Sequence, residues 1–384
     1  MNKNWCSYIK GSSIVPVILL LMLLPPLSSA GQKPFFEKQI LSGYNNAGLY
    51  ANAYPVIGRM NNGRLLCVFA VLPDHQVKKL SIAFSTSDDN GIHWSKPVLL
   101  FNDAHTSHSD PNMVIDGDRV LVFSTSVTFP KPPKIDSTFI MMRSTTDGQD
   151  WTKEVFIKKP HRYICGKIHQ GHRLKDGSLI MGYSWDTWAE QRMPASTEGE
   201  MNLRSGVLRS GDGGRTWKPG GDLYAAVKKI APGATSGLGE PATVVLKDGR
   251  IMTLMRAGGS KLYQAWSSDG GLSWTAPTPS TLTAHNSPAA LWRLDQSGDV
   301  LAVWSNVPNG RNALAAALSS DGGKTWSSPK PIARSDRFQV SYPSAVQAGD
   351  GTLIAVWQQD IGEGKREVCI ARFNRAWLLS REPH

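Results

Sequence analysis

The sequence Ser-Ser-Asp-Gly-Gly-Lys-Thr-Trp at residues 319–326 decides the fold expected for this 384-residue chain. It fits the pattern Ser-x-Asp-x-Gly-x-x-Trp, which is typical of a tight turn between strands, because Asp and Ser side chains cap turn amides and Gly supplies a positive φ. The Trp ring is suited to burial between neighbouring sheets. The same pattern occurs at residues 87–94, 210–217 and 267–274, and a degenerate copy at 144–151 carries Thr146 at the aspartate position. We interpret these five Asp boxes as structural.

The spacing of the boxes predicts a β-propeller. Their tryptophans follow one another after 57, 66, 57 and 52 residues, and a repeat near fifty residues suits a four-stranded blade. Hairpin turns rich in Asp, Asn and Gly interleave with the boxes at residues 62–63, 116–117, 176–177, 248–249, 298–299 and 350–351. Six hairpins and five boxes predict an all-β, six-bladed propeller. Its sixth blade lacks a box and is closed by residues 36–41 pairing with residues 367–373.

The composition agrees with many short strands and excludes a helical bundle. The chain contains 36 Gly and 24 Pro, more chain-breaking residues than long helices tolerate, and its 13 Trp suit strands. It has 42 Lys+Arg against 31 Asp+Glu, a formal net charge of +11. The basic residues are scattered without a Lys/Arg-rich run, so we expect no nucleic-acid partner. An excess of positive charge is instead compatible with an acidic glycan or polysaccharide.

The N-terminus has the organisation of a secretory signal peptide. Lys3 and Lys10 precede an apolar stretch at residues 14–24, and small residues at 28–30 offer a cleavage site. We predict a signal peptide over residues 1–30, a propeller over residues 31–384, and a secreted protein (extracellular or periplasmic) with no stable membrane insertion after cleavage. An uncleaved anchor is the alternative. The remaining cysteines, Cys67, Cys165 and Cys369, are odd in number and lack metal-ligand spacing, so we expect neither a metal nor another cofactor.

Five Asp boxes on six blades of a secreted chain resemble the sialidase (neuraminidase) or BNR-repeat superfamily across the whole predicted propeller. Residues 239–246 and 341–344 resemble its blade-opening strands closely. The resemblance implies an exo-glycosidase that acts on terminal acidic sugars such as sialic acid. Enzymes of this kind use three arginines on the substrate carboxylate, a Tyr/Glu nucleophilic pair and an Asp acid/base.

The resemblance assigns roles to individual residues. Tyr342 matches the nucleophile and Glu240 its base, each at the start of an inner strand, while Asp74 is the candidate acid/base. Two further residues, Arg256 and Arg311, match the second and third arginines of the carboxylate clamp, a role that guanidinium groups fill well. A rim aspartate of the second blade, also a candidate for substrate binding, is matched by Asp110.

The chain departs from the family at one interaction. Ala53 stands where the family has its first clamp arginine, and Gln358 stands where it has the glutamate that holds that arginine. The loss of both partners together indicates a reshaped pocket. Arg59 and Arg64 lie nearby in sequence, but their spacing does not favour them as substitutes.

Several histidines are compatible with a different function. His105 and His108 precede the second blade, His169 and His172 open the third, and His75 adjoins Asp74. Imidazole can act as acid or base near neutral pH, so a polysaccharide lyase that uses His, Tyr and Arg on uronate-containing glycans is an alternative, with His172 as a substrate-binding candidate. A third possibility is a glycan-binding propeller without catalysis. The long segment at residues 186–203 is either a lid over the pocket or an ordinary rim insertion.

Overall fold

The computed structural model describes residues 33–74, 76–132, 135, 137–165, 170–191, 201–227, 229 and 234–381. The predicted signal peptide lies outside these residues. Every described helix and strand belongs to one compact unit, Pro34–His384. Two short helices, α1 (Thr187–Glu190) and α2 (Arg375–Leu379), accompany the strands. The prediction of an all-β fold is confirmed.

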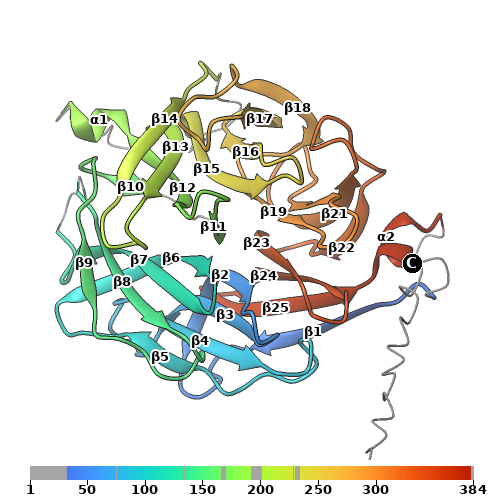
Figure 1. Ribbon diagram of the computed structural model, residues 1–384. Coiled ribbons are helices and arrows are strands. Elements are labelled where there is room, and N and C mark those ends of the chain that lie inside the picture. The colour runs from blue at the N-terminus through green and yellow to red at the C-terminus, as the bar shows by residue number, and fades with distance from the viewer. Residues whose placement is uncertain are drawn as a thin grey trace, which may run out of the picture. The chain divides into compact units, whose positions relative to one another are not determined.

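The strands form successive antiparallel groups in chain order (Figure 1). The first two groups are β2 (Tyr50–Arg59), β3 (Leu65–Leu72), β4 (Ser81–Ser87) and β5 (Val98–Phe101), then β6 (Thr106–Asp116), β7 (Arg119–Thr128), β8 (Phe139–Thr145) and β9 (Val155–Ile157). The third is β10 (Ile164–Cys165), β11 (Gln170–Arg173), β12 (Leu179–Asp186), β13 (Asn202–Ser210) and β14 (Lys218–Leu223).

The later groups repeat the plan. The fourth is β15 (Ser236–Val245), β16 (Ile251–Ala257), β17 (Lys261–Ser267) and β18 (Thr278–Thr283), and the fifth is β19 (Ala289–Arg293), β20 (Val300–Trp304), β21 (Ala313–Ser319) and β22 (Lys330–Arg334). The last combines β23 (Val340–Gln347), β24 (Leu353–Gly362) and β25 (Lys365–Phe373) with β1 (Phe36–Ser42). Short parallel pairings of β6 with β11 and of β13 with β15 join β6–β18 into one thirteen-stranded sheet.

The N-terminal strand completes the last sheet. Phe36 pairs with Phe373 and Ile40 pairs with Cys369 in an antiparallel ladder between β1 and β25. This confirms the predicted pairing of residues 36–41 with residues 367–373. A strand from one end of the chain therefore holds a strand from the other end, which places the described first and last groups next to each other.

The opening strands of neighbouring groups contact one another in sequence. β2 contacts β6, β6 contacts β11, β11 and β12 contact β15, β15 contacts β19, β19 contacts β23, and β23 contacts β2 again. Apolar clusters lie between the groups: Ile57 and Cys67 of the first group, for example, pack with Ile354 and Val356 of the last. The box tryptophans pack on or within such clusters, with Trp217 only 6% exposed. Apolar burial between sheets is the main stabilising contribution.

The Asp boxes form the turns that the sequence predicts. In the box at 319–326 the Ser319 hydroxyl donates to Asp321 at 2.8 Å and accepts from the Gly323 N–H at 2.8 Å. The same Asp321 carboxylate accepts from the Lys324 and Thr325 N–H groups. Burial by itself raises the pKa of Asp321, but the hydrogen bonds from Thr325 and Ser319 outweigh it and lower the pKa to about 2. Each box is thus a self-capped turn that keeps its aspartate ionised.

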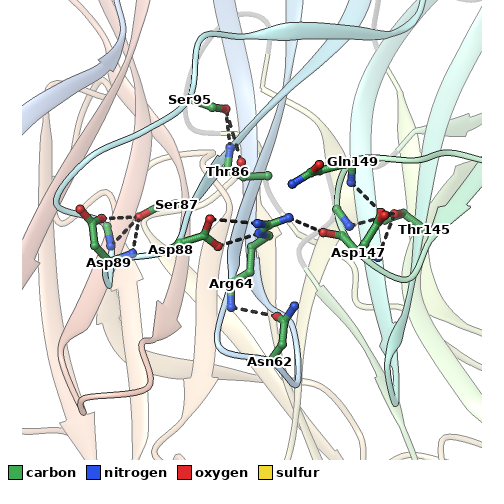
Figure 2. Close-up of polar contacts among 12 residues, drawn as sticks. Asn62, Arg64, Thr86, Ser87, Asp88, Asp89, Ser95, Thr145, Asp147 and Gln149 are labelled. Carbon is green, nitrogen blue, oxygen red and sulfur yellow. Dashed lines mark hydrogen bonds and ion pairs between the residues drawn. The ribbon is translucent and has the colours of Figure 1, made fainter.

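The degenerate box has an aspartate after all, which corrects the alignment used above. Thr145 takes the place of the box serine, because its hydroxyl donates to Asp147 at 2.9 Å and accepts from the Gly148 N–H at 2.9 Å. The Asp147 carboxylate accepts from the Gln149 and Asp150 N–H groups, as Figure 2 shows in part. This turn is one residue shorter than the other boxes, so counting from residue 144 put Thr146 at the aspartate position.

Arg64 ties the first two boxes together (Figure 2). Its guanidinium forms two hydrogen bonds with the Asp88 carboxylate, at 2.7 and 2.9 Å, and a third with the Asp147 carbonyl oxygen at 2.5 Å. Arg59 is engaged in a similar way, with the Ala348 carbonyl oxygen and with Asp295. Both arginines therefore connect neighbouring strand groups.

The corrected assignment of this box predicts which substitution lowers the melting temperature. Asp147→Ala removes the cap and should lower the melting temperature by about 2 °C at neutral pH, whereas Thr146→Ala, at an exposed position, should leave it unchanged. Hydrogen bonds from Gln149 and Asp150 lower the pKa of Asp147 from 3.8, so its contribution is full above that value and is lost as the pH falls below it. Thermal unfolding of both variants at pH 7 and pH 3 tests this, and a larger effect of Thr146→Ala would contradict it.

Candidate active site

Four strands share an unusual backbone feature within their first half, a few residues after each begins. Tyr54, Asp110, Glu240 and Tyr342 each directly precede a proline and have positive φ values of 54°, 45°, 45° and 54°. The ladder register shifts at each of these points, between Ala53 and Val56 in β2 for example. Left-handed backbone is costly for residues other than Gly, and a bulge re-aims the side chain that it carries. The same local device therefore presents four polar side chains from four strand groups.

Glu240 and Arg256 form a buried ion pair. The Glu240 Oε1 atom lies 3.0 Å from Arg256 Nη1, with the side chains 10% and 11% exposed. Burial opposes the charge on Arg256, but the carboxylate of Glu240 and the neighbouring Tyr342 raise its pKa above the ordinary value, so it stays cationic. The second carboxylate oxygen, Oε2, is buried and has no hydrogen-bond partner among the described residues. Glu240 thus keeps one oxygen able to accept a proton.

Arg311 and Tyr342 form a second pair beside the first. Arg311 Nη1 donates to the Tyr342 hydroxyl at 3.2 Å, and its Cζ lies 5.4 Å from the centre of the tyrosine ring. Asn286 connects the two pairs: its Oδ1 accepts from Arg256 Nε at 2.9 Å and its carbonyl oxygen accepts from Arg311 Nη2. Four predicted site residues are therefore joined in one hydrogen-bonded cluster.

Tyr54 extends the cluster toward β2. Its ring meets the Tyr342 ring edge to face, with centroids 4.9 Å apart. Burial raises the pKa of Tyr54, and the neighbouring Tyr342, Asp110 and Glu240 raise it further, so the phenol stays protonated. Because the charge of Asp110 acts on the Tyr54 phenol, Asp110 lies near the same cluster. A hollow of about 390 Å³ is lined in part by Arg311, together with residues 309–312 and 336–339.

Sequence reasoning missed Tyr54 and Asn286 as site residues. Tyr54 had a signal, because Tyr54-Pro55 repeats the Tyr342-Pro343 pattern at the opening of another hairpin unit. Asn286 had a weaker one: it precedes Pro288 by two residues instead of one, and it too has a positive φ, of 44°.

Two predicted residues are placed elsewhere by their contacts. Asp74 is exposed, and its Oδ1 accepts from the Gln76 N–H at 2.8 Å. The His172 ring donates through Nε2 to the Thr243 carbonyl oxygen at 2.7 Å, which links β11 to β15, and burial lowers its pKa. No hydrogen bond or ion pair among the described residues joins either side chain to the Glu240 cluster. Their roles as acid/base and substrate contact stay predictions.

The other histidines also have structural contacts where the structure describes them. His108 is buried, with Nε2 2.7 Å from Asp103 and Nδ1 2.9 Å from the Ser126 hydroxyl. His105 is exposed, and both His75 and His169 lie outside the described residues. Of the segment at 186–203, α1 is described: Asp186 caps it by accepting from the Trp188 N–H at 3.1 Å, and residues 192–200 are not described.

The described residues show neither a metal site nor a membrane-spanning helix nor a disulfide. They contain no group of three His, Cys, Asp or Glu side chains placed to hold a metal ion. None of their helices has both the length and the apolar character needed to cross a membrane. The three cysteines among them, Cys67, Cys165 and Cys369, are free thiols.

Comparison with known proteins places this arrangement in a family. A family model described as a BNR repeat-like domain matches residues 63–356. A curated sialidase of Bacteroides fragilis (strain YCH46) is 25% identical over 314 residues, which cover 71% of this chain and 53% of the relative. This chain therefore spans about half the length of that relative.

Solved structures show the same fold. A Hadza microbial sialidase has a TM-score of 0.72 at 16% identity, over 88% of this chain and 68% of its own. Trypanosoma rangeli sialidase, which has also been solved in complex with sialic acid, has a TM-score of 0.69 at 13% identity, over 89% and 60%. A protein of unknown function from Dyadobacter fermentans has a TM-score of 0.69 at 18% identity, over 88% and 99%. With the family match spanning most of the described strands, the chain belongs to the BNR repeat-like family of the sialidase superfamily.

Proposed function

We propose that this chain is a glycoside hydrolase of the sialidase type that releases terminal acidic sugars, sialic acid or a related sugar, from glycans. One observation carries the proposal: the predicted nucleophile Tyr342 and the predicted base Glu240 lie in one cluster, each paired with an arginine. An anionic sugar calls for this combination, because guanidinium groups bind its carboxylate while a neutral phenol approaches its anomeric carbon. The relative named sialidase supports the same activity.

We also propose that the fold is a six-bladed propeller. In this reading each antiparallel strand group is a blade, and β1 supplies the outer strand of the last one. The circular order of contacts among β2, β6, β11, β15, β19 and β23 supports it. The opening strands would then surround a common axis, which is where a propeller binds small ligands.

The proposed reaction divides between two residues of the cluster. The Tyr342 hydroxyl oxygen attacks the anomeric carbon while its proton passes to Glu240, whose Oε2 is free to accept it. The bond to the departing glycan oxygen breaks, and an acid, predicted to be Asp74, supplies that oxygen with a proton. Water then reverses the steps. Its oxygen bonds to the anomeric carbon and gives one proton to the deprotonated acid, the bond from that carbon to the Tyr342 oxygen breaks, Glu240 returns its proton to that oxygen, and the free sugar leaves.

The arginines bind the carboxylate and keep the site cationic. Arg256 is already compensated by Glu240, so its pairing with a substrate anion would share that charge. Among the described residues, the side-chain hydrogen bonds of Arg311 go only to neutral partners, Tyr342 and the Asn286 carbonyl. Arg311 is therefore the stronger of the two anion sites. Asp110 is proposed to contact substrate hydroxyls from the opposite strand group.

We also propose that the protein acts outside the cytoplasm after removal of residues 1–30. The basic stretch, apolar core and small residues of that segment support this. Glycans that carry terminal acidic sugars are exposed to a secreted enzyme.

Product analysis by mass spectrometry is the primary test of the function. The protein is incubated with pooled sialylated and uronate-rich glycans, and the expected product is a free nonulosonic acid with an intact ring. An unsaturated uronate would instead establish a lyase, and the absence of any product would leave a glycan-binding propeller.

Tyr342→Phe should reduce turnover by about 1,000-fold or more, because the variant lacks the attacking oxygen. The matched control is Tyr263→Phe on β17, outside the cluster, which should keep wild-type turnover. Initial rates with the substrate found by product analysis measure both. Full activity of Tyr342→Phe would rule out a tyrosine nucleophile.

Glu240→Gln should abolish turnover and also destabilise the fold by about 3 kcal/mol, since it leaves the Arg256 charge buried without its counter-charge. The double variant Glu240→Gln/Arg256→Met removes both charges and should recover most of the lost stability but none of the activity. Urea unfolding followed by tryptophan fluorescence measures the stability of each. If the double variant is less stable than Glu240→Gln, the pair is not a compensated ion pair.

A further inference from the structure

A second ion pair lies on the β24–β25 hairpin beside the proposed site. Asp360 and Arg366 face each other in the ladder, and Arg366 Nε donates to Asp360 Oδ1 at 3.1 Å. Gln358 Nε2 donates to the same carboxylate oxygen at 2.9 Å. Arg366 is 33% exposed and Asp360 24% exposed, so the pair is reachable from solvent while Gln358, 1% exposed, is buried behind it.

This hairpin lies next to the strands that carry the tyrosines. β2 packs against both β24 and β25, and Asn52 of β2 donates to the Arg366 carbonyl oxygen at 3.4 Å. On the other side, Ser341, the neighbour of Tyr342, pairs with Gln358 in the β23–β24 ladder. Burial raises the pKa of Tyr54, and Arg366 acts on the same phenol in the opposite direction. Arg366 is therefore within electrostatic reach of the Tyr54–Tyr342 contact.

The pair retains unused hydrogen-bonding capacity. Within the described part of the chain, the side-chain hydrogen bonds of Arg366 use only Nε, which leaves Nη1 and Nη2, two donors suited to a carboxylate. The Gln358 Oε1 atom is buried and has no hydrogen-bond partner there. An unpartnered buried acceptor is costly unless a ligand or water satisfies it. Because Gln358 is buried behind the pair, the two unused donors of Arg366 are the groups that point to a ligand, and they call for an anion.

Other arginines near β2 do not compete for this role. Position 53 holds a buried alanine, 1% exposed and paired with Ala70. The guanidinium groups of Arg59 and Arg64 are committed to contacts between strand groups, with Asp295 and the Asp147 carbonyl oxygen respectively.

We propose that Arg366, positioned by Asp360 and Gln358, binds the carboxylate of the substrate and supplies, from β25, the arginine that β2 lacks at Ala53. This inference rests on the proposed function, because it assigns the anion-binding residue of that same site. Arg366 is a binding residue, and Asp360 is a positioning residue that orients its guanidinium.

The test compares an acid with its neutral derivative in the full chain. The probes are the 4-methylumbelliferyl α-glycoside of N-acetylneuraminic acid and its methyl ester. Arg366→Gln should raise KM for the acid about 30-fold with a much smaller change in kcat, and should leave the weak binding of the ester unchanged. Arg366→Lys should recover part of the loss, since it restores the charge but not the paired donors. Asp360→Asn should raise KM by about fivefold.

Arg250→Gln is the matched control. Arg250 forms an exposed pair with Asp248 at 2.8 Å in the turn between β15 and β16, and its variant should match wild type in KM, kcat and melting temperature. Melting curves identify any Arg366 variant that fails to fold. If Arg366→Gln fails to fold, the ratio of acid to ester binding by Arg366→Lys decides whether Arg366 binds the carboxylate.

The wild-type protein and the variants answer different questions. If the wild type hydrolyses the acid and Arg366→Gln does so with unchanged KM, Arg366 is not an anion-binding residue, although the proposed function stands. Equal losses for acid and ester would show a structural role and would also overturn the inference. If the wild type hydrolyses neither probe, the proposed function fails for this sugar. Equilibrium binding of free N-acetylneuraminic acid and its carboxamide to wild type and Arg366→Gln then judges Arg366 separately.

Discussion

The left-handed backbone before proline is the constraint on which the site depends. At Tyr54, Asp110, Glu240 and Tyr342 the chain adopts a positive φ that costs roughly 1–3 kcal/mol per residue. Proline contributes because it lacks the N–H that would continue the ladder, so the register shifts and the preceding side chain changes direction. Without the bulge, strict alternation would send each of these side chains to one face of its own sheet.

Such strain persists only because the flanking structure is firmly held. On the far side of each bulge the strand continues in a regular ladder whose apolar side chains are almost completely buried, as with Val56 and Ile57 after Tyr54. The Asp boxes fix the turns through hydrogen bonds within themselves, and their tryptophans pack on the clusters between sheets. The stabilising contacts lie beyond the bulges and between the sheets, while the strained backbone and the buried Glu240–Arg256 pair lie at or beside the bulges.

Much of the fold could be read from the sequence because its signals are local. A box or an Asp-Gly turn specifies a hairpin within ten residues. The pairing of β1 with β25 could be predicted because residues 36–41 are a strand that precedes the first hairpin unit and the sixth unit needs a further strand. The box at 144–151 was misaligned because it is one residue shorter than the others: a count that begins at Ser144 reaches Thr146, whereas the contacts begin at Thr145 and reach Asp147.

The candidate site could be predicted only in part, and the reason is geometric. Tyr342, Glu240, Arg256 and Arg311 were found because their positions in the hairpin units and their residue types match the resemblance. Asn286 was missed because it binds Arg311 through its backbone carbonyl oxygen, a group that every residue type has. His172 has the right chemistry for a site, but its strand turns the ring toward Thr243. Arg366 lies on a third strand of its group, where the hairpin pattern offers no reason to look.

The proposed role of Arg366 would rebuild a carboxylate clamp without altering the strands that define it. A substrate anion requires guanidinium donors at a certain point in space, and the strand that supplies them is immaterial. An arginine on β2 would need a counter-charge reaching across from another strand group, whereas Asp360 and Arg366 face each other on one hairpin and need only Gln358 beside them. Because this unit is self-contained, Ala53 can be buried in the sheet and Gln358 can be neutral, so under this proposal a single relocation of positive charge accounts for both departures from the family pattern.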